Sequence, residues 1–396
     1  MARSKNPNGI QGNVKMKIIP IFRKNRVQDV KPVANNDVEY SSQWKLIYKR
    51  FKKHKLARIS MIVLGLLYFG AIFAQFIAPY SLESYDSRYV NAPPMMIRFV
   101  DADGKFHIQP FVYGLKSSRH PETMRKIFEA DTEVRYKLQL FVKGEPYKFL
   151  GLFTTDIHLF GVEEPGRLFL FGTDSMGRDL FSRIMLGSQI SLSIPLVGVS
   201  ISFVLGIIIG GISGYFGGWI DSAIQRVIEI IRSFPTIPLW MALSAAIPPR
   251  VPVVTMYFYI VIILALIGWT DLARVVRGKF FSLKNEDYVL AAKISGVSDT
   301  KIIIRHLLPG FLSYLVVATT LAIPAMILGE TTMSFLGLGI RSPATSWGVL
   351  LQEAQQIENV SLYPWKLIPL GSVILTVMAF NFMGDGLRDA ADPYKR

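Results

Sequence analysis

The chain of 396 residues contains no cysteine and only five histidines. Without cysteine, a disulfide framework and a thiolate metal site are excluded. The histidines lie too far apart in sequence to form a metal-binding pair, so no metal site is predicted. There is also no Gly-x-x-x-x-Gly-Lys-Ser/Thr loop, so the chain is not expected to hydrolyse ATP itself. The five histidines are His54, His107, His120, His158 and His306.

Enzyme motifs are missing as well. The sequence has no nucleophile elbow and no carboxylate pair set in a soluble pocket. Residues 298–301 have the Ser-x-x-Lys spacing, but they lie in a polar loop between two apolar runs, and we interpret the match as chance. We therefore predict no catalytic residue and a protein that is not an enzyme.

Apolar residues make up 51% of the chain and are gathered into long runs. About 20 apolar residues are needed for a helix to cross a bilayer, and six runs approach that length. The sequence therefore predicts an all-α membrane protein with six transmembrane helices. The runs cover residues 57–78, 191–215, 224–247, 256–276, 311–336 and 365–384.

The positive charge is concentrated at the N-terminus, where residues 1–58 hold 15 Lys and Arg against three acidic residues. A basic flank beside a span stays on the cytoplasmic side. Basic tails also occur in nucleic-acid-binding proteins. Here, however, KRFKKHK at 49–55 adjoins the first span, which favours contact with the lipid bilayer and no nucleic-acid partner. The first run is longer than a signal-peptide core and begins late, so we expect it to remain uncleaved.

With the N-terminus inside, alternating spans place both termini and residues 277–310 in the cytoplasm. The chain then divides into a basic cytoplasmic tail (1–55), a first transmembrane helix (56–78), an extracytoplasmic insert (79–171) and a five-helix core (172–396). A multi-pass protein of the cell (cytoplasmic) membrane is predicted. Basic residues in the 277–310 loop support this orientation independently: Arg277, Lys279, Lys284, Lys293, Lys301 and Arg305.

The insert is long enough to fold on its own. Alternating apolar residues predict strands at 105–112 and 137–143. Pro121 near the start of 121–128 predicts a short helix, and Gly-Glu-Pro at 144–146 predicts a turn. We therefore expect a small α+β insert, whose role, particularly over residues 96–165, the sequence does not reveal.

A polar string, GTDSMGRDLFSR at 172–183, precedes the second span. Asp174, Arg178 and Asp179 are near enough in sequence to exchange charge-assisted hydrogen bonds. Thr173 can cap the helix that follows. We interpret the three charged residues as a fixed cluster at the outer mouth. The alternative is an interfacial helix with a solvated cap.

This string resembles a signature of the oligopeptide/dipeptide ABC-importer permeases, in the second of their two permease subunits. The order and spacing of further matches strengthen the resemblance, which runs from about residue 56 to 393. It implies a six-helix permease of the type I ABC-importer kind. The further matches are YFGGWID at 215–221 with Arg226 and Glu229, SFP at 233–235, GE at 329–330, SFLGLG at 334–339 and WG at 347–348.

The same resemblance implies that residues 284–310 form the loop that docks on an ATPase subunit. Small side chains leave a shallow groove, and glycine permits a bend without a Cβ clash. Proline fits the first turn of the next helix. Two positions depart from the family pattern, because Leu290 replaces an acidic residue and Gly310 replaces a common asparagine. The predicted docking residues are Ala291, Ala292, Gly296, Lys301, Arg305, Leu308 and Pro309.

Two features within the spans are also informative. Glu330 lies near the outer end of the fifth run, where it either lines a translocation pathway or reaches the lipid headgroups. Gly206, Gly210 and Gly214 recur every four residues, which predicts close helix packing.

The resemblance implies a permease subunit that forms half of the pore of an ATP-driven importer of short peptides. It implies four kinds of partner: a second permease subunit, two cytoplasmic ATPases that carry ATP and Mg, an extracytoplasmic solute-binding protein, and the bilayer. This chain itself is expected to bind no cofactor. Import of oligosaccharides by the same machinery stays open. A self-sufficient secondary transporter is disfavoured because no inverted repeat or mid-membrane ion ligand is evident. A membrane-anchored scaffold would leave the motifs unexplained.

Overall fold

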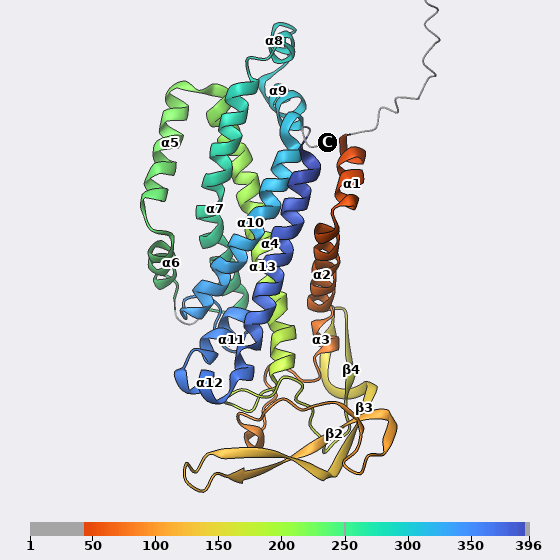
Figure 1. Cartoon of the computed structure of the whole chain (residues 1–396). Coiled ribbons are helices and arrows are strands. Elements are labelled where there is room, and N and C mark those ends of the chain that lie inside the picture. Colours follow the sequence, from red (N-terminus) through yellow and green to blue (C-terminus); the bar gives the residue numbers. More distant parts are fainter. Residues whose placement is uncertain (1–42, 249–250, 393–396) are drawn as a thin grey trace, which may run out of the picture. The chain divides into compact units, whose positions relative to one another are not determined.

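The computed structural model describes residues 43–248 and 251–392. The chain divides into two compact units, Met1–Gln43 and Trp44–Arg396, and nearly all described residues belong to the second. The predicted tail lies mostly outside the described residues, as do both chain ends. The described part of the second unit consists of helices, with one β-sheet between the first span and the core (Figure 1).

Long apolar helices form the bulk of the unit, because in a bilayer the backbone must satisfy its own hydrogen bonds. The main helices are α1 (Gln43–Lys53), α2 (Lys55–Ile72), α3 (Ala74–Ile77), α4 (Leu180–Phe216), α5 (Gly218–Ser233), α6 (Thr236–Ala245), α7 (Val253–Leu283), α10 (Leu312–Phe335) and α13 (Ile368–Ala391). The shorter ones are α8 (Asp287–Ile294), α9 (Asp299–Ile302), α11 (Trp347–Ala354) and α12 (Ile357–Leu362). Single turns lie at η1 (Ser87–Tyr89), η2 (Ile303–Leu307), η3 (Leu308–Phe311) and η4 (Pro364–Leu367).

Five of the described helical segments are long and apolar enough to cross a membrane. The third predicted span is not a single helix. It consists of α5 and α6, which are bent by 87° at the break between them. Pro235 lies in that break and Pro238 in the following turn, and proline cannot continue a helix without losing a hydrogen bond. The predicted count of six is reached only if the bent pair counts as one span.

The two ends of the helix bundle carry different elements. At one end lie α1, the end of α13 and the α8–α9 segment (Figure 1). Phe51, Ala57 and Ala390 pack together there. The insert, α11 and α12 lie at the opposite end. This matches the predicted grouping of segments, whereas the side of the membrane that each end faces stays a prediction.

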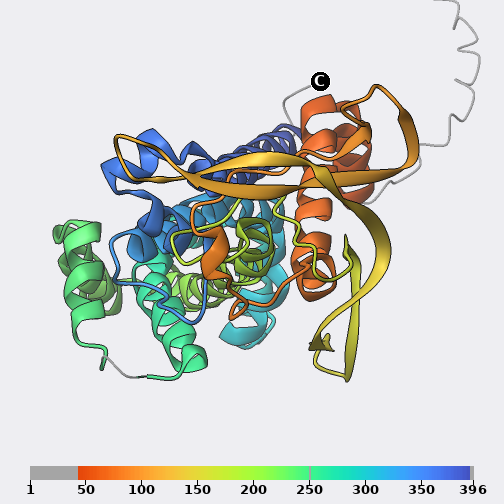
Figure 2. The ribbon, with the colours of Figure 1, turned by 90° about the horizontal axis from the view of Figure 1, so that it is seen from below.

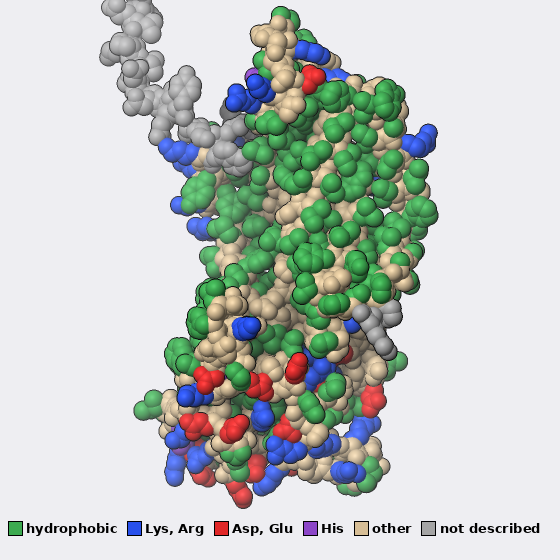
Figure 3. All heavy atoms as spheres, turned by 180° about the vertical axis from the view of Figure 1, so that it is seen from behind, with side chains coloured by type: hydrophobic (Ala, Val, Ile, Leu, Met, Phe, Trp, Pro, Cys, Tyr) green, Lys and Arg blue, Asp and Glu red, His purple; other side chains and the backbone are tan. Residues whose placement is uncertain are grey.

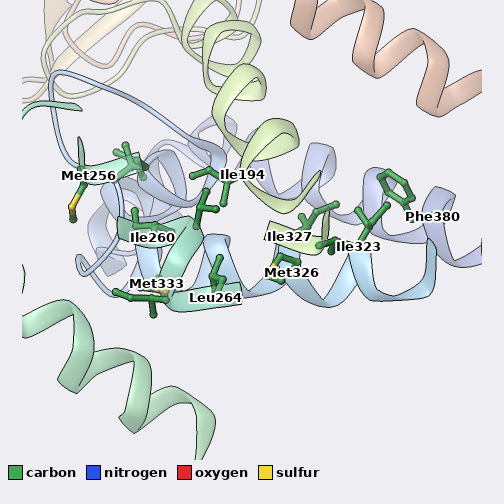
Figure 4. Close-up of a cluster of buried hydrophobic side chains, with 14 of the residues drawn as sticks. Ile194, Met256, Ile260, Leu264, Ile323, Met326, Ile327, Met333 and Phe380 are labelled. Carbon is green, nitrogen blue, oxygen red and sulfur yellow. The ribbon is translucent and has the colours of Figure 1, made fainter. Parts of the chain in front are cut away.

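The bundle interior is apolar. Its largest buried cluster joins α4, α7, α10 and α13, with Ile194, Leu264, Ile327 and Phe380 among its members (Figure 4). On the outside, hydrophobic side chains cover the helical part of the molecule, and charged side chains gather over the insert (Figure 3). This distribution is that of a protein whose helices face lipid and whose insert lies largely in water.

The predicted close packing of the three glycines is confirmed, and their partner is α7. A Cβ at Gly210 would lie 2.4 Å from the Ala273 carbonyl oxygen, and one at Gly214 would lie 2.5 Å from the Arg277 carbonyl oxygen. Only glycine allows two backbones to approach this closely.

The insert forms a four-stranded antiparallel sheet in the order β1–β2–β3–β4. Its strands are β1 (Arg98–Val100), β2 (Phe106–Arg119), β3 (Lys126–Phe149) and β4 (Phe153–Val162). The long β3 pairs with β2 through its first half and with β4 through its second. Seen from the insert's end of the bundle, the β2–β3 hairpin crosses the helices, and the β3–β4 hairpin lies beside α3 (Figure 2).

Both predicted strands are confirmed, but the α+β assignment is wrong. Residues 121–125 form a hairpin turn in which the His120 amide donates to the Arg125 carbonyl (2.8 Å), and Ile127 and Phe128 then pair with β2. Pro121 therefore begins a turn and not a helix. Residues 144–146 do not reverse the chain; they form an irregularity in the β3–β4 register.

Candidate functional site

The α8–α9 segment carries the predicted docking residues, and α8 projects beyond the ends of neighbouring helices (Figure 1). Helix α8 ends in a Schellman motif: the Gly296 amide donates to the Lys293 carbonyl and the Val297 amide to the Ala292 carbonyl, both at 3.1 Å. Gly296 has φ +76°, a conformation that glycine adopts without strain. Its Cβ position is open space, so backbone conformation and not crowding requires glycine here.

The two alanines do not form one exposed small face, as the sequence suggested. Ala291 is exposed, whereas Ala292 is buried beside Val289, Ile302 and Leu307. A small side chain at 292 lets α8 pack onto the turns that follow it. The exposed apolar side chains of α8 are different ones, with Ile294 88% exposed and Leu290 42% exposed.

The remaining predicted docking residues differ in environment. Lys301 and Arg305 are exposed. Pro309 lies in the first turn of η3, as predicted. Leu308 is only half-buried, and the apolar anchor is its neighbour Leu307, which is fully buried.

Polar contacts tie this segment to the bundle. The Tyr215 hydroxyl at the end of α4 donates to the Asp299 carboxylate of α9 (2.5 Å). Asp221 of α5 accepts hydrogen bonds from the Ser213 hydroxyl (2.5 Å) and from Arg277 of α7 through Nε (2.5 Å) and Nη2 (2.6 Å). The ends of α4, α5 and α7 are thus joined to one another and to the base of the projecting segment.

At the opposite end of the bundle, Asp174 belongs to a buried ion-pair network. Its Oδ2 accepts from Arg178 Nε and from Arg183 Nη1, both at 2.6 Å. Arg183 also donates to both oxygens of Glu353, at 2.5 and 2.8 Å. Arg178 reaches Glu353 at 3.3 Å. The network joins the start of α4 to α11, which lies 170 residues further along the chain.

Asp179 does not take part in this network, contrary to the prediction. It is the N-cap of α4, and its Oδ2 accepts from the Ser182 amide (2.7 Å) and hydroxyl (2.6 Å). Burial raises the pKa of Asp179 to about 7, against the lowering effect of these hydrogen bonds. Thr173 is not the helix cap. Its hydroxyl instead accepts from the Ala92 amide (2.7 Å) and donates to the Tyr89 carbonyl.

Two family models match the chain. One, described as a binding-protein-dependent transport system inner membrane component, matches residues 183–396. The other, described as the N-terminal TM domain of oligopeptide transport permease C, matches residues 42–94. The chain belongs to the first of these families. It is a permease-family protein with a helical, multi-pass architecture, and neither model covers residues 95–182.

Individual relatives agree with this assignment. The "Dipeptide transport system permease protein DppC" of Lactococcus lactis subsp. cremoris is 33% identical over 87% of this chain and 89% of its own length. The "Oligopeptide transport system permease protein OppC" of Haemophilus influenzae is 43% identical over 57% of this chain and 70% of its own. The DppC protein of Bacillus subtilis is 40% identical over a similar share.

Within this permease, Glu330 reaches neither lipid nor solvent. It is fully buried on α10. The Ser334 hydroxyl donates to its Oε1 (2.8 Å) and the Ser191 hydroxyl of α4 to its Oε2 (3.3 Å). Ser191 also accepts from the Trp347 amide at the start of α11 (3.0 Å). The headgroup alternative is therefore wrong, and Glu330 joins α4, α10 and α11; a pathway role stays a prediction.

Among the described residues, no group of three or more His, Asp or Glu side chains is arranged to hold a metal ion.

Sequence reasoning missed Arg183 and Glu353, although Arg183 is the last residue of the GTDSMGRDLFSR string. Glu353 lies in a segment with no distinguishing pattern, so no sequence signal was available for it.

Replacing Arg183 with methionine is expected to destabilise the permease by about 3 kcal/mol, the lower part of the range for a broken buried pair, because Glu353 is partly exposed. The matched control is Arg226→Met, which removes the exposed pair with Glu229 and should cost about 1 kcal/mol or less. Denaturation of the purified variants in detergent measures both. If both variants lower the free energy of unfolding by the same small amount, the network is solvated and adds little stability.

Proposed function

We propose that this chain is one of two permease subunits of an ATP-driven importer and forms half of its pore for short peptides. A solute-binding protein would deliver the peptide from outside, and two cytoplasmic ATPases would drive the cycle. The observation that carries the proposal is the projecting α8, whose exposed Ile294 and Leu290 need an apolar partner surface.

The peptide substrate is supported by the relatives, whose names describe oligopeptide and dipeptide transport permeases. Oligosaccharide import by the same machinery is the alternative. ATP and Mg would be bound by the ATPase subunits, and this chain is expected to need no cofactor of its own.

The contacts at the base of α8 suggest how movement would be transmitted. The Schellman motif and the buried Ala292 hold α8 firmly on the turns at 302–307. The Tyr215–Asp299 hydrogen bond and the Asp221–Arg277 pair link these turns to α4, α5 and α7. A displacement of α8 by a closing ATPase would then move the ends of three helices together. Such coupling requires two states with different contacts at both ends of the bundle.

The proposed orientation has α8, α9 and the C-terminal end of α13 in the cytoplasm and the β-sheet outside. The concentration of basic residues in and around the α8–α9 segment supports it. Helix α8 and the sheet lie at opposite ends of the bundle, as an orientation with one inside and the other outside requires.

Because the chain has no cysteine, single cysteines report the orientation cleanly. Ser118 of β2 and Ser298 before α9 are both exposed and suit this purpose. In intact cells, an impermeant thiol reagent should label Ser118→Cys and should label Ser298→Cys only after the membrane is opened. The reverse pattern would refute the orientation.

Replacing Ile294 with aspartate should release the ATPase subunits, because a charged group would be left without water in an apolar groove. The matched control is Ile357→Asp at the opposite end of the bundle, where the side chain is 87% exposed. Co-purification of the ATPases, at equal membrane levels of the two variants, is the measurement. Retention of the ATPases by both variants would remove the docking role of α8.

A further inference from the structure

The two hairpins of the insert end in turns of opposite character. The β2–β3 turn carries RHPETMRK at 119–126, which is rich in charge. The β3–β4 turn carries FLGLFTT at 149–155, which contains no charged residue. A hairpin turn in water normally uses Asn, Asp and Gly. Here Leu150 occupies a positive φ of 49°, a conformation unusual for a bulky apolar residue.

Three apolar side chains of this second turn are exposed. Leu152 is 80% exposed, Phe153 is 59% exposed and Leu150 is 49% exposed. Leu140 and Phe141 further back along β3 are 69% and 64% exposed. We call Leu150, Leu152 and Phe153 the hairpin tip patch. Three exposed apolar side chains gathered in one short turn mark an interaction surface.

The patch adjoins the end of the first span. The ring of Phe149, within the turn, lies 5.9 Å from that of Phe73 and 6.3 Å from that of Phe76. The ring of Phe141 lies 6.3 Å from that of Phe76. Figure 1 shows the β3–β4 hairpin running beside α3 toward the end of α2. A cavity of about 200 Å³ between them is lined by Ile72 and Leu150 among others.

The contacts lie just beyond the end of α2, so the length of α2 sets their depth. The apolar span Lys55–Ile72 contains 18 residues. At 1.5 Å per residue it is about 27 Å long, slightly less than the hydrocarbon core of about 30 Å. Residues 72–76 therefore lie where hydrocarbon gives way to headgroups, and so does any group packed beside them.

We propose that the tip of the β3–β4 hairpin is a membrane anchor, with the hairpin tip patch buried in the bilayer leaflet on the insert's side. Lipid is favoured as the occupant because the patch continues directly into the lipid-facing side of α2, where Phe69 and Ile72 are 57% and 55% exposed. Aromatic and aliphatic side chains at the headgroup boundary are typical of such contacts. Lys148, the charged residue of β3 nearest the patch in sequence, can extend toward the headgroups.

The anchor would fix the height of the sheet above the membrane. Strand β3 carries both hairpins, so holding one tip in lipid restrains the other, charged hairpin where it crosses the end of the bundle (Figure 2). This inference depends on α2 crossing the bilayer and not on the substrate or the ATPases.

The test uses the full chain in lipid nanodiscs with a nitroxide label on one introduced cysteine. Leu152→Cys probes the proposed anchor and Glu122→Cys, in the other hairpin turn, is the matched control. Oxygen concentrates in hydrocarbon and a nickel chelate stays in water. We expect the label at 152 to be several-fold more accessible to oxygen than to the nickel chelate. The label at 122 should be more accessible to the nickel chelate than to oxygen by a similar factor.

Two results would overturn the anchor. In the first, the label at 152 favours the nickel chelate as strongly as the label at 122, so that the tip is in water. In the second, adding the partner subunits shields position 152 from both oxygen and the nickel chelate, so that protein covers the patch. Persistence of the oxygen preference in the assembled complex supports lipid as the occupant.

Discussion

The contact between α4 and α7 is the one on which most of the bundle depends. At Gly210 and Gly214 the two backbones lie so close that no side chain fits between them. Helix α4 also contacts α2, α5, α10 and α11. Because α4 is the longest of the described helices, it extends from the ion-pair network at one end to the base of α8 at the other. Its position relative to α7 therefore determines the geometry of both candidate sites.

Polar groups at several levels of α4 join it to different elements, and three of them reach the two ends and the middle of the bundle. Arg183 pairs with Asp174 and Glu353 at the insert's end. Ser191 joins Glu330 to the start of α11. Tyr215 reaches Asp299 at the far end. A buried polar group without a partner is costly in a membrane, so each of these contacts specifies one arrangement of helices. A movement of α8 would thus be transmitted through defined contacts.

Much of the helical part could be predicted from the sequence because spanning helices need long apolar runs, and those runs are visible directly. The break between α5 and α6 was not predicted. Pro235 is visible in the sequence, but two apolar segments separated by a proline have the same composition as one continuous span. The predicted helix at 121–128 failed for a related reason: Pro121 suits the first turn of a helix and also a hairpin turn, and pairing with β2 decides between them.

The sites were predictable only where the interactions are local. The bend at Gly296 and the first-turn position of Pro309 were predicted correctly, because such local conformation depends on neighbouring residues, whereas their docking role stays a prediction. The pairing of Arg183 with Glu353 depends on the folded bundle, and no local pattern encodes it. Ala292 was assigned to a contact surface but is buried, because small residues serve close internal packing as well as docking.

The most direct test of the proposed function is peptide uptake by proteoliposomes that contain this chain with its second permease subunit and both ATPases. The solute-binding protein and a labelled peptide are supplied on the side of the sheet. Uptake should require ATP on the α8 side and should stop when the ATPases are omitted. Uptake that is driven by an ion gradient without ATP or the ATPases would contradict the account and indicate a secondary transporter.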